Sequence, residues 1–141
     1  MKILIGVLFI LTGFVPIPEH SDELVSVKVR IKNIENDDSN VMVAVFRSYD
    51  TFLTEDMHRK EIVKVQNFTE AEIEFKLERG EYAIAAFQDK NKNGDLDRNF
   101  FAYPSEPFGF SNNFRPLIKP PHWTEVSFQV EAEMVVEVEL K

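Results

Sequence analysis

Hydrophobic and polar residues alternate one by one over much of the chain after residue 24. In segment 25–32 the apolar residues Val25, Val27, Val29 and Ile31 are interleaved with Ser26, Lys28, Arg30 and Lys32. Because successive side chains of a β-strand point to opposite faces of a sheet, this period of two predicts a half-buried strand. Segments 71–77 and 134–140 repeat the pattern. The turn-forming cluster at 36–40 ends the first of these strands.

Shorter or more continuous apolar runs predict four more strands, at 41–46, 61–66, 81–88 and 126–130. Residues 48–60 have no clean period and are expected to form a loop with one helical turn, and residues 89–121 form the longest irregular stretch. No convincing amphipathic helix is visible. About seven short strands separated by turns predict an all-β fold: a single antiparallel β-sandwich, immunoglobulin-like or prealbumin-like, with one long loop. A barrel is the alternative.

Composition narrows the classes of function. The 141 residues and 44% hydrophobic content suit one domain with a real core. A net charge of −8 without any run of Lys or Arg argues against nucleic acid as a partner, because binding a phosphate backbone needs a basic patch. An acidic surface favours cations instead. The absence of cysteine excludes disulfides, zinc–thiolate sites and cysteine nucleophiles.

The N-terminal segment predicts the compartment. Lys2 is followed by an apolar run over residues 3–15, and the prolines at 16 and 18 end that run. The run is too short for a transmembrane helix, which needs about 20 residues, and its length suits a signal peptide. Residues 1–20 are therefore expected to be a signal peptide and 21–141 the mature domain. We expect a periplasmic or secreted protein with no stable membrane span after processing.

The segment 89–97 carries the clearest chemical motif. Its sequence, Asp-Lys-Asn-Lys-Asn-Gly-Asp-Leu-Asp, has the D-x-[DN]-x-[DN]-G form of a calcium loop. Calcium takes six to eight oxygen ligands, which alternate positions of a tight loop can direct to one point. The predicted ligands are the side chains of Asp89, Asn91, Asn93 and Asp97 and the backbone carbonyl of Asp95. Gly94 allows the sharp turn.

The motif differs from an EF-hand in two respects. Loop position 12 is Phe100 instead of a glutamate, and the flanking segments are predicted as strand and loop instead of helices. Another carboxylate must then complete the shell, and Glu106 is the nearest candidate. The competing interpretation is a metal-free turn, because Asn-Gly favours a hairpin turn and Asp and Asn side chains satisfy turn backbones by themselves.

Three motifs in order resemble the DUF2141 family of uncharacterised bacterial proteins. These are Gly-Glu-Tyr-Ala-Ile at 80–84, the loop at 89–97, and Pro-Ser-Glu-Pro-Phe-Gly-Phe-Ser-Asn-Asn at 104–113. The resemblance covers nearly all of the chain after the signal segment. It implies a secreted β-sandwich and says little about function, since the family has no established activity.

Three functional classes follow from these patterns. The preferred one is an exported non-catalytic β-sandwich, not an enzyme, in which calcium or Asx turns stabilise the long loop. The second is a module that binds a small molecule, glycan or peptide through Glu106 and the loop aromatics, although those aromatics are expected mainly to pack together as the loop's own core. The third is a small hydrolase using acidic residues of the same loop. The scattered histidines His20, His58 and His122 predict no metal site.

Overall fold

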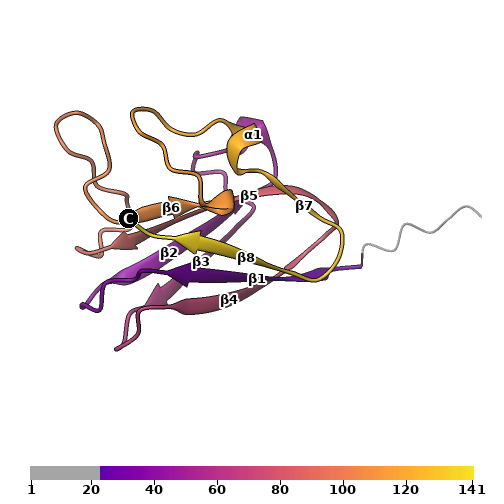
Figure 1. The fold of residues 1–141 in the computed structure, drawn as a ribbon, viewed down its shortest axis with the longest axis horizontal. Coiled ribbons are helices and arrows are strands. Elements are labelled where there is room, and N and C mark those ends of the chain that lie inside the picture. The colour runs from indigo at the N-terminus through magenta and orange to yellow at the C-terminus, as the bar shows by residue number, and fades with distance from the viewer. Residues whose placement is uncertain (1–22) are drawn as a thin grey trace, which may run out of the picture.

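The computed structural model describes residues 23–141 as two packed β-sheets (Figure 1). The strands are β1 (Val25–Lys32), β2 (Asn40–Phe46), β3 (Arg59–Lys64), β4 (Ala71–Leu77), β5 (Gly80–Asp89), β6 (Phe108–Phe110), β7 (Phe128–Val130) and β8 (Met134–Glu139). Within residues 23–141, helical structure is limited to the α-helical turn α1 (Trp123–Val126) and two 3-10 turns, Tyr49–Thr51 and Ser111–Asn113. The N-terminal segment 1–20, predicted as a signal peptide, lies outside the described residues.

The two sheets have the strand orders β4-β1-β8 and β3-β2-β5-β6, and β7 adds to one end of β5. All pairs are antiparallel except β1 and β8, which run parallel. The parallel pair joins the first and last strands of the described residues, with β1 in the centre of the smaller sheet and β8 at its edge. No helix in residues 23–141 is long and apolar enough to cross a membrane.

The core lies between the sheets and follows the alternation of the sequence. The inward residues Val27, Val29 and Ile31 of β1 are all fully buried. They face Val41, Val43 and Val45 of β2 and Tyr82, Ile84 and Ala86 of β5 in one cluster. Apolar burial of this kind contributes about 25 cal/mol per Å² and is the main term that holds two sheets together.

The predicted all-β sandwich is confirmed, with three local differences. The strand predicted at 71–77 has those bounds, the strand predicted at 134–140 ends one residue earlier at Glu139, and the helical turn within 48–60 is present. The sequence missed β6, because three residues are too few to show a period. Val126, predicted at the start of a strand, instead lies in α1, where it is buried together with Trp123. The parallel β1–β8 pair also departs from the expected antiparallel arrangement.

Candidate functional site: the loop at 89–97 and the adjoining groove

Strand β5 ends at Asp89, whose side chain organises the loop that follows. The residue is 2% exposed. Its Oδ1 accepts a hydrogen bond from the backbone N–H of Asn93 at 3.1 Å, and its Oδ2 accepts one from Gly94 at 2.8 Å. Gly94 has a φ of +86°, a conformation that side-chain-bearing residues rarely adopt. The loop therefore turns back over the carboxylate at its own first position.

The side chains at alternate loop positions lie close together and are joined by hydrogen bonds. Asn91 Nδ2 lies 2.5 Å from Asp97 Oδ2, and Asn93 Nδ2 lies 3.1 Å from Asp97 Oδ1. The oxygens of both asparagines also accept backbone N–H groups within the loop, Asn91 from Asn93 and Asn93 from Asp95. Positions 1, 3, 5 and 9 are thus brought into one hydrogen-bonded group, which is the geometry of successive Asx turns.

Glu106 joins the two ends of the loop. It is 7% exposed, and its carboxylate accepts a hydrogen bond from the backbone N–H of Lys90 at 2.8 Å and of Asp97 at 3.1 Å. A further backbone hydrogen bond, from Ser105 N–H to the Asp97 carbonyl, brings this residue alongside. The structure thus places Glu106 against the loop, as the sequence predicts, with both oxygens directed at backbone donors. Its role as a metal ligand stays a prediction.

The turn between β1 and β2 supports the other side of the loop. Gln88, fully buried, donates through Nε2 to the Glu35 carbonyl and to Ser39 Oγ at 2.6 and 2.7 Å, and its Oε1 accepts from Glu35 N–H. Lys90 pairs with Glu35, and Lys92 Nζ lies 2.6 Å from Asp38 Oδ1. The hydrogen bond from Lys90 to Glu35 raises the pKa of that lysine, and the hydrogen bond from Lys92 lowers the pKa of Asp38.

The donor set of the loop suits a hard cation. Two carboxylates, two amide oxygens and one backbone carbonyl are the ligand types that calcium prefers. Within residues 23–141, no group of three or more His, Cys, Asp or Glu side chains is arranged to hold a metal ion. Beside Asp89 and Asp97, the predicted ligands are therefore amide and backbone oxygens of the loop, with Glu106 as the candidate that would complete the shell.

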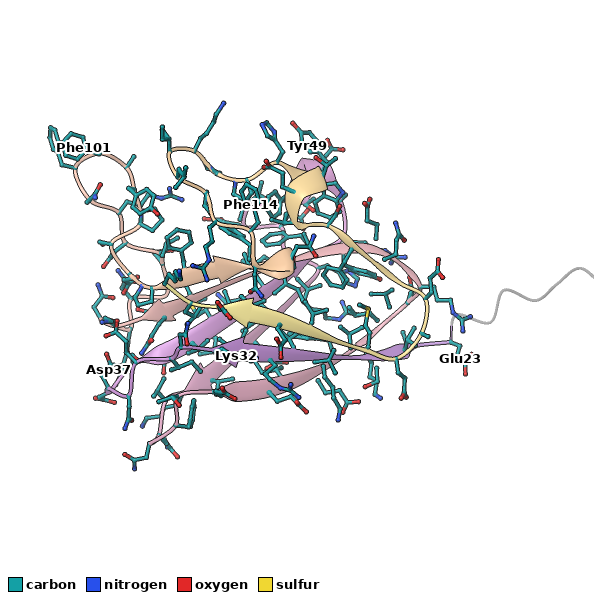
Figure 2. The ribbon with its side chains drawn as sticks, viewed as in Figure 1. Glu23, Lys32, Asp37, Tyr49, Phe101 and Phe114 are labelled. Atoms are coloured by element: carbon teal, nitrogen blue, oxygen red, sulfur yellow. The ribbon has the colours of Figure 1, made fainter. Side chains whose placement is uncertain are left out.

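The aromatic residues expected to form the loop's own core divide into two sets. Phe110 and Trp123 are buried with Phe46 in a second hydrophobic cluster, which Phe52 and Phe114 complete. Phe100 and Phe101 are instead 97% and 85% exposed at the tip of the long loop, where their rings meet edge to face (Figure 2 labels Phe101). The expectation is therefore confirmed for the base of the long segment and wrong for its tip.

A groove beside the loop was not anticipated from the sequence. It has a volume of about 570 Å³ and lies over the outer face of the five-stranded sheet, between segments 53–57, 94–104 and 116–120. Two of these segments form the loops that project from the same side of the sandwich in Figure 1. One feature of the sequence could have indicated the groove. The outward-facing residues of β5, Ala83, Ala85 and Phe87, are apolar, whereas a solvent-facing strand would carry polar residues there.

Comparisons with known proteins give one match. No curated protein and no solved structure matches the chain. The model of one family, described as an uncharacterised protein conserved in bacteria (DUF2141), matches residues 29–138. The match spans both sheets, the loop at 89–97 and the groove, and extends from β1 to β8. The chain belongs to the DUF2141 family.

Proposed function

We propose that this protein is an exported, non-catalytic β-sandwich in which the loop at 89–97 binds a calcium ion. The observation that carries the proposal is the convergence of oxygen-bearing side chains from alternate loop positions, held by a buried strand end. Asp89 contacts the backbone N–H groups of Asn93 and Gly94, and Asp97 contacts the side chains of Asn91 and Asn93. The atoms of Asn91 and Asn93 that now face Asp97 are amide nitrogens, so a cation at this point would require both amides to turn their oxygens toward it.

The charge of the site sets its expected affinity. Asp89 and Asp97 are the two carboxylates among the predicted loop ligands, fewer than tight EF-hand sites provide. Extracellular calcium modules with weaker ligand sets have dissociation constants of about 10⁻⁴ to 10⁻³ M. An exported protein meets calcium in this range outside the cytoplasm, so a weak site is sufficient to stabilise the loop.

Calcium titration of residues 21–141 tests the proposal. Because an ion that binds only the folded state stabilises it by mass action, calcium at ten times its dissociation constant should add about 1.4 kcal/mol to the free energy of unfolding. Calorimetry should show one site, and the melting temperature should rise. Asp89→Ala should abolish the increment. Asp95→Ala is the matched control, since it removes a carboxylate from the same loop and keeps the backbone carbonyl that is the predicted ligand.

A turn held by Asx hydrogen bonds alone gives a different result. Asp89→Ala would then destabilise the protein by the same amount in calcium and in chelator, because the lost contacts are those with the N–H groups of Asn93 and Gly94. Equal destabilisation, together with no calcium-dependent shift in the parent protein, would contradict calcium binding.

Export is the other half of the proposal and has its own test. Expression of the full chain in a bacterium should yield a periplasmic or secreted product that begins near residues 16–23, because the apolar run at 3–15 has the length of a signal segment. Mass spectrometry of the fractionated cells measures the N-terminus. Full-length protein confined to the cytoplasm would end this part of the proposal.

A glycan- or peptide-binding module is the second candidate. The paired rings of Phe100 and Phe101, 5.5 Å apart and exposed, are the observation in its favour, since exposed aromatic faces stack well on such ligands. Binding on a glycan array that is lost in Phe101→Ala would support it over a purely structural role.

A further inference from the structure

The floor of the groove is an apolar sheet face with a hollow at its centre. Ala44 of β2 pairs with Ala85 of β5, and Ala85 pairs in turn with Phe110 of β6. Directly paired residues of neighbouring strands point to the same face, so these side chains form one row. The adjacent row is Met42, Phe87 and Phe108. Two alanines flanked by larger side chains leave a depression in the outer face.

Loops enclose the depression on three sides. Leu53 and Met57 line it from the segment after β2, Leu96 and Tyr103 from the long loop, and Ile118 from the segment before α1. Tyr103 also contacts the segment before α1, since its hydroxyl lies 3.5 Å from the carbonyl oxygen of Pro116. The volume of about 570 Å³ lies within the range of about 300–1,000 Å³ that is typical of small-molecule sites.

Unpaired cations surround this apolar floor. Lys60, Arg98 and Lys119 line the groove, and within residues 23–141 none of the three makes an ion pair, whereas nine other Lys or Arg residues do. Lys60 extends the floor itself, since it pairs with Ala44. Two carboxylates, Glu55 and Asp95, also line the groove.

The local charge contrasts with that of the whole chain. Segment 98–124, which supplies two of the groove's three cations, has three Lys or Arg residues and a single acid, Glu106. That acid is buried against backbone N–H groups. The chain as a whole has a net charge of −8. The three cations that line the groove outnumber its two carboxylates, Glu55 and Asp95, by one. The groove is therefore an apolar surface with a small excess of positive charge in an otherwise acidic protein, which complements an anion with an apolar body.

We propose that this groove binds an anionic amphiphile, a molecule with an apolar chain or ring system and a carboxylate, sulfonate or phosphate head. The apolar part lies on the Ala44–Ala85 floor, and the head is held by Lys60, Arg98 and Lys119. Exposed apolar side chains at the entrance extend the same surface outward, since Ile118 lines the groove and is 91% exposed. The groove shares Gly94 and Asp95 with the loop at 89–97, but its floor and its three cations lie outside the predicted calcium ligands. Its test gives a result whether or not the loop binds calcium.

Competition binding measures both halves of the proposal. The protein, as residues 21–141, is mixed with 1-anilinonaphthalene-8-sulfonate, whose fluorescence rises in an apolar site. Dodecanoate, dodecanol and dodecyltrimethylammonium, each below its micelle concentration, then compete for it. The three share one chain and differ in the charge of the head. Dodecanoate should displace the probe at one equivalent and bind at least tenfold more tightly than the ammonium compound. Equal competition by all three compounds would contradict the proposal that the groove selects an anionic head group.

Substitutions locate the site. Ala85→Trp fills the hollow and should weaken dodecanoate binding at least tenfold, and Leu53→Asp, at a side chain already 41% exposed, should weaken it without a folding risk. Lys60→Gln should weaken binding about threefold to tenfold. Lys64→Gln is its matched control, because Lys64 is on the same strand, is exposed and makes no ion pair in the described part of the chain, yet does not line the groove. Parent-like binding by both Ala85→Trp and Leu53→Asp would overturn the proposal.

A vesicle-binding experiment distinguishes a dissolved amphiphile from a membrane lipid as the ligand of the groove. Vesicles of dioleoylphosphatidylglycerol that sediment the protein, with release by dodecanoate, would identify a membrane lipid as the source of the same chemistry. Binding of dodecanoate without sedimentation would identify a dissolved amphiphile, and both results support the groove. Sedimentation that dodecanoate does not reverse and that Ala85→Trp does not alter would overturn the proposal in favour of surface attachment through the exposed loop tips.

Discussion

Gly109→Ala is expected to destabilise the domain by about 3 kcal/mol or more, although it adds a single methyl group. A Cβ atom at this position would lie 2.3 Å from the carbonyl oxygen of Glu139 and 3.0 Å from its carbonyl carbon. Both are backbone atoms, so β6 must move away from β8. That movement would break the reciprocal hydrogen bonds between Phe108 and Lys141, which connect β6 to the chain end that follows β8. Overpacking of a core site usually costs about 1–3 kcal/mol, and a backbone clash exceeds that range.

Gly94→Ala provides the comparison. Nothing lies within 4 Å of a Cβ at Gly94, so its cost is conformational alone, from the φ of +86°. A left-handed conformation costs a side-chain-bearing residue about 1–2 kcal/mol. Urea denaturation of both variants measures the difference. A Gly109→Ala variant that is no less stable than Gly94→Ala would contradict the close approach of β6 and β8.

Glu106→Ala is expected to destabilise the domain by about 2–4 kcal/mol, in calcium and in chelator alike. The variant leaves the N–H groups of Lys90 and Asp97 without their acceptor. A hydrogen bond to a charged group contributes about 1.5–3 kcal/mol, and here two are lost. Protease resistance of segment 90–105 should fall as well, because Glu106 joins the two ends of that loop.

Glu106→Gln distinguishes the two roles of this residue. A glutamine keeps one oxygen acceptor and turns a donor toward the other N–H, so the protein should lose roughly half as much stability as Glu106→Ala. If Glu106 also ligates calcium, as the sequence predicts, the calcium-dependent rise in melting temperature should shrink in Glu106→Gln. An unchanged calcium increment beside a reduced baseline stability would restrict Glu106 to holding the loop ends.

The strand pattern was readable from the sequence because it rests on local chemistry. In β1, Val27, Val29 and Ile31 alternate with charged residues, and burial of the apolar set leaves one orientation for the strand. The loop at 89–97 was readable for a similar reason. Its aspartates and asparagines satisfy backbone N–H groups within five residues of themselves, so neighbours along the chain determine its shape.

Only the tertiary structure decided the contacts between distant segments. Strand β6 has three residues and no period of its own, and its place follows from pairing with β5 and from the space that Gly109 leaves for β8. The parallel pairing of β1 with β8 joins segments more than 100 residues apart. The groove likewise requires Ala44 and Ala85 to meet in register while three loops rise around them. Sequence alone determined which residues turn inward and how the loop folds on itself, because those depend on near neighbours. The pairing of the strands and the shape of the groove depend on packing between distant segments, which a local sequence pattern does not predict.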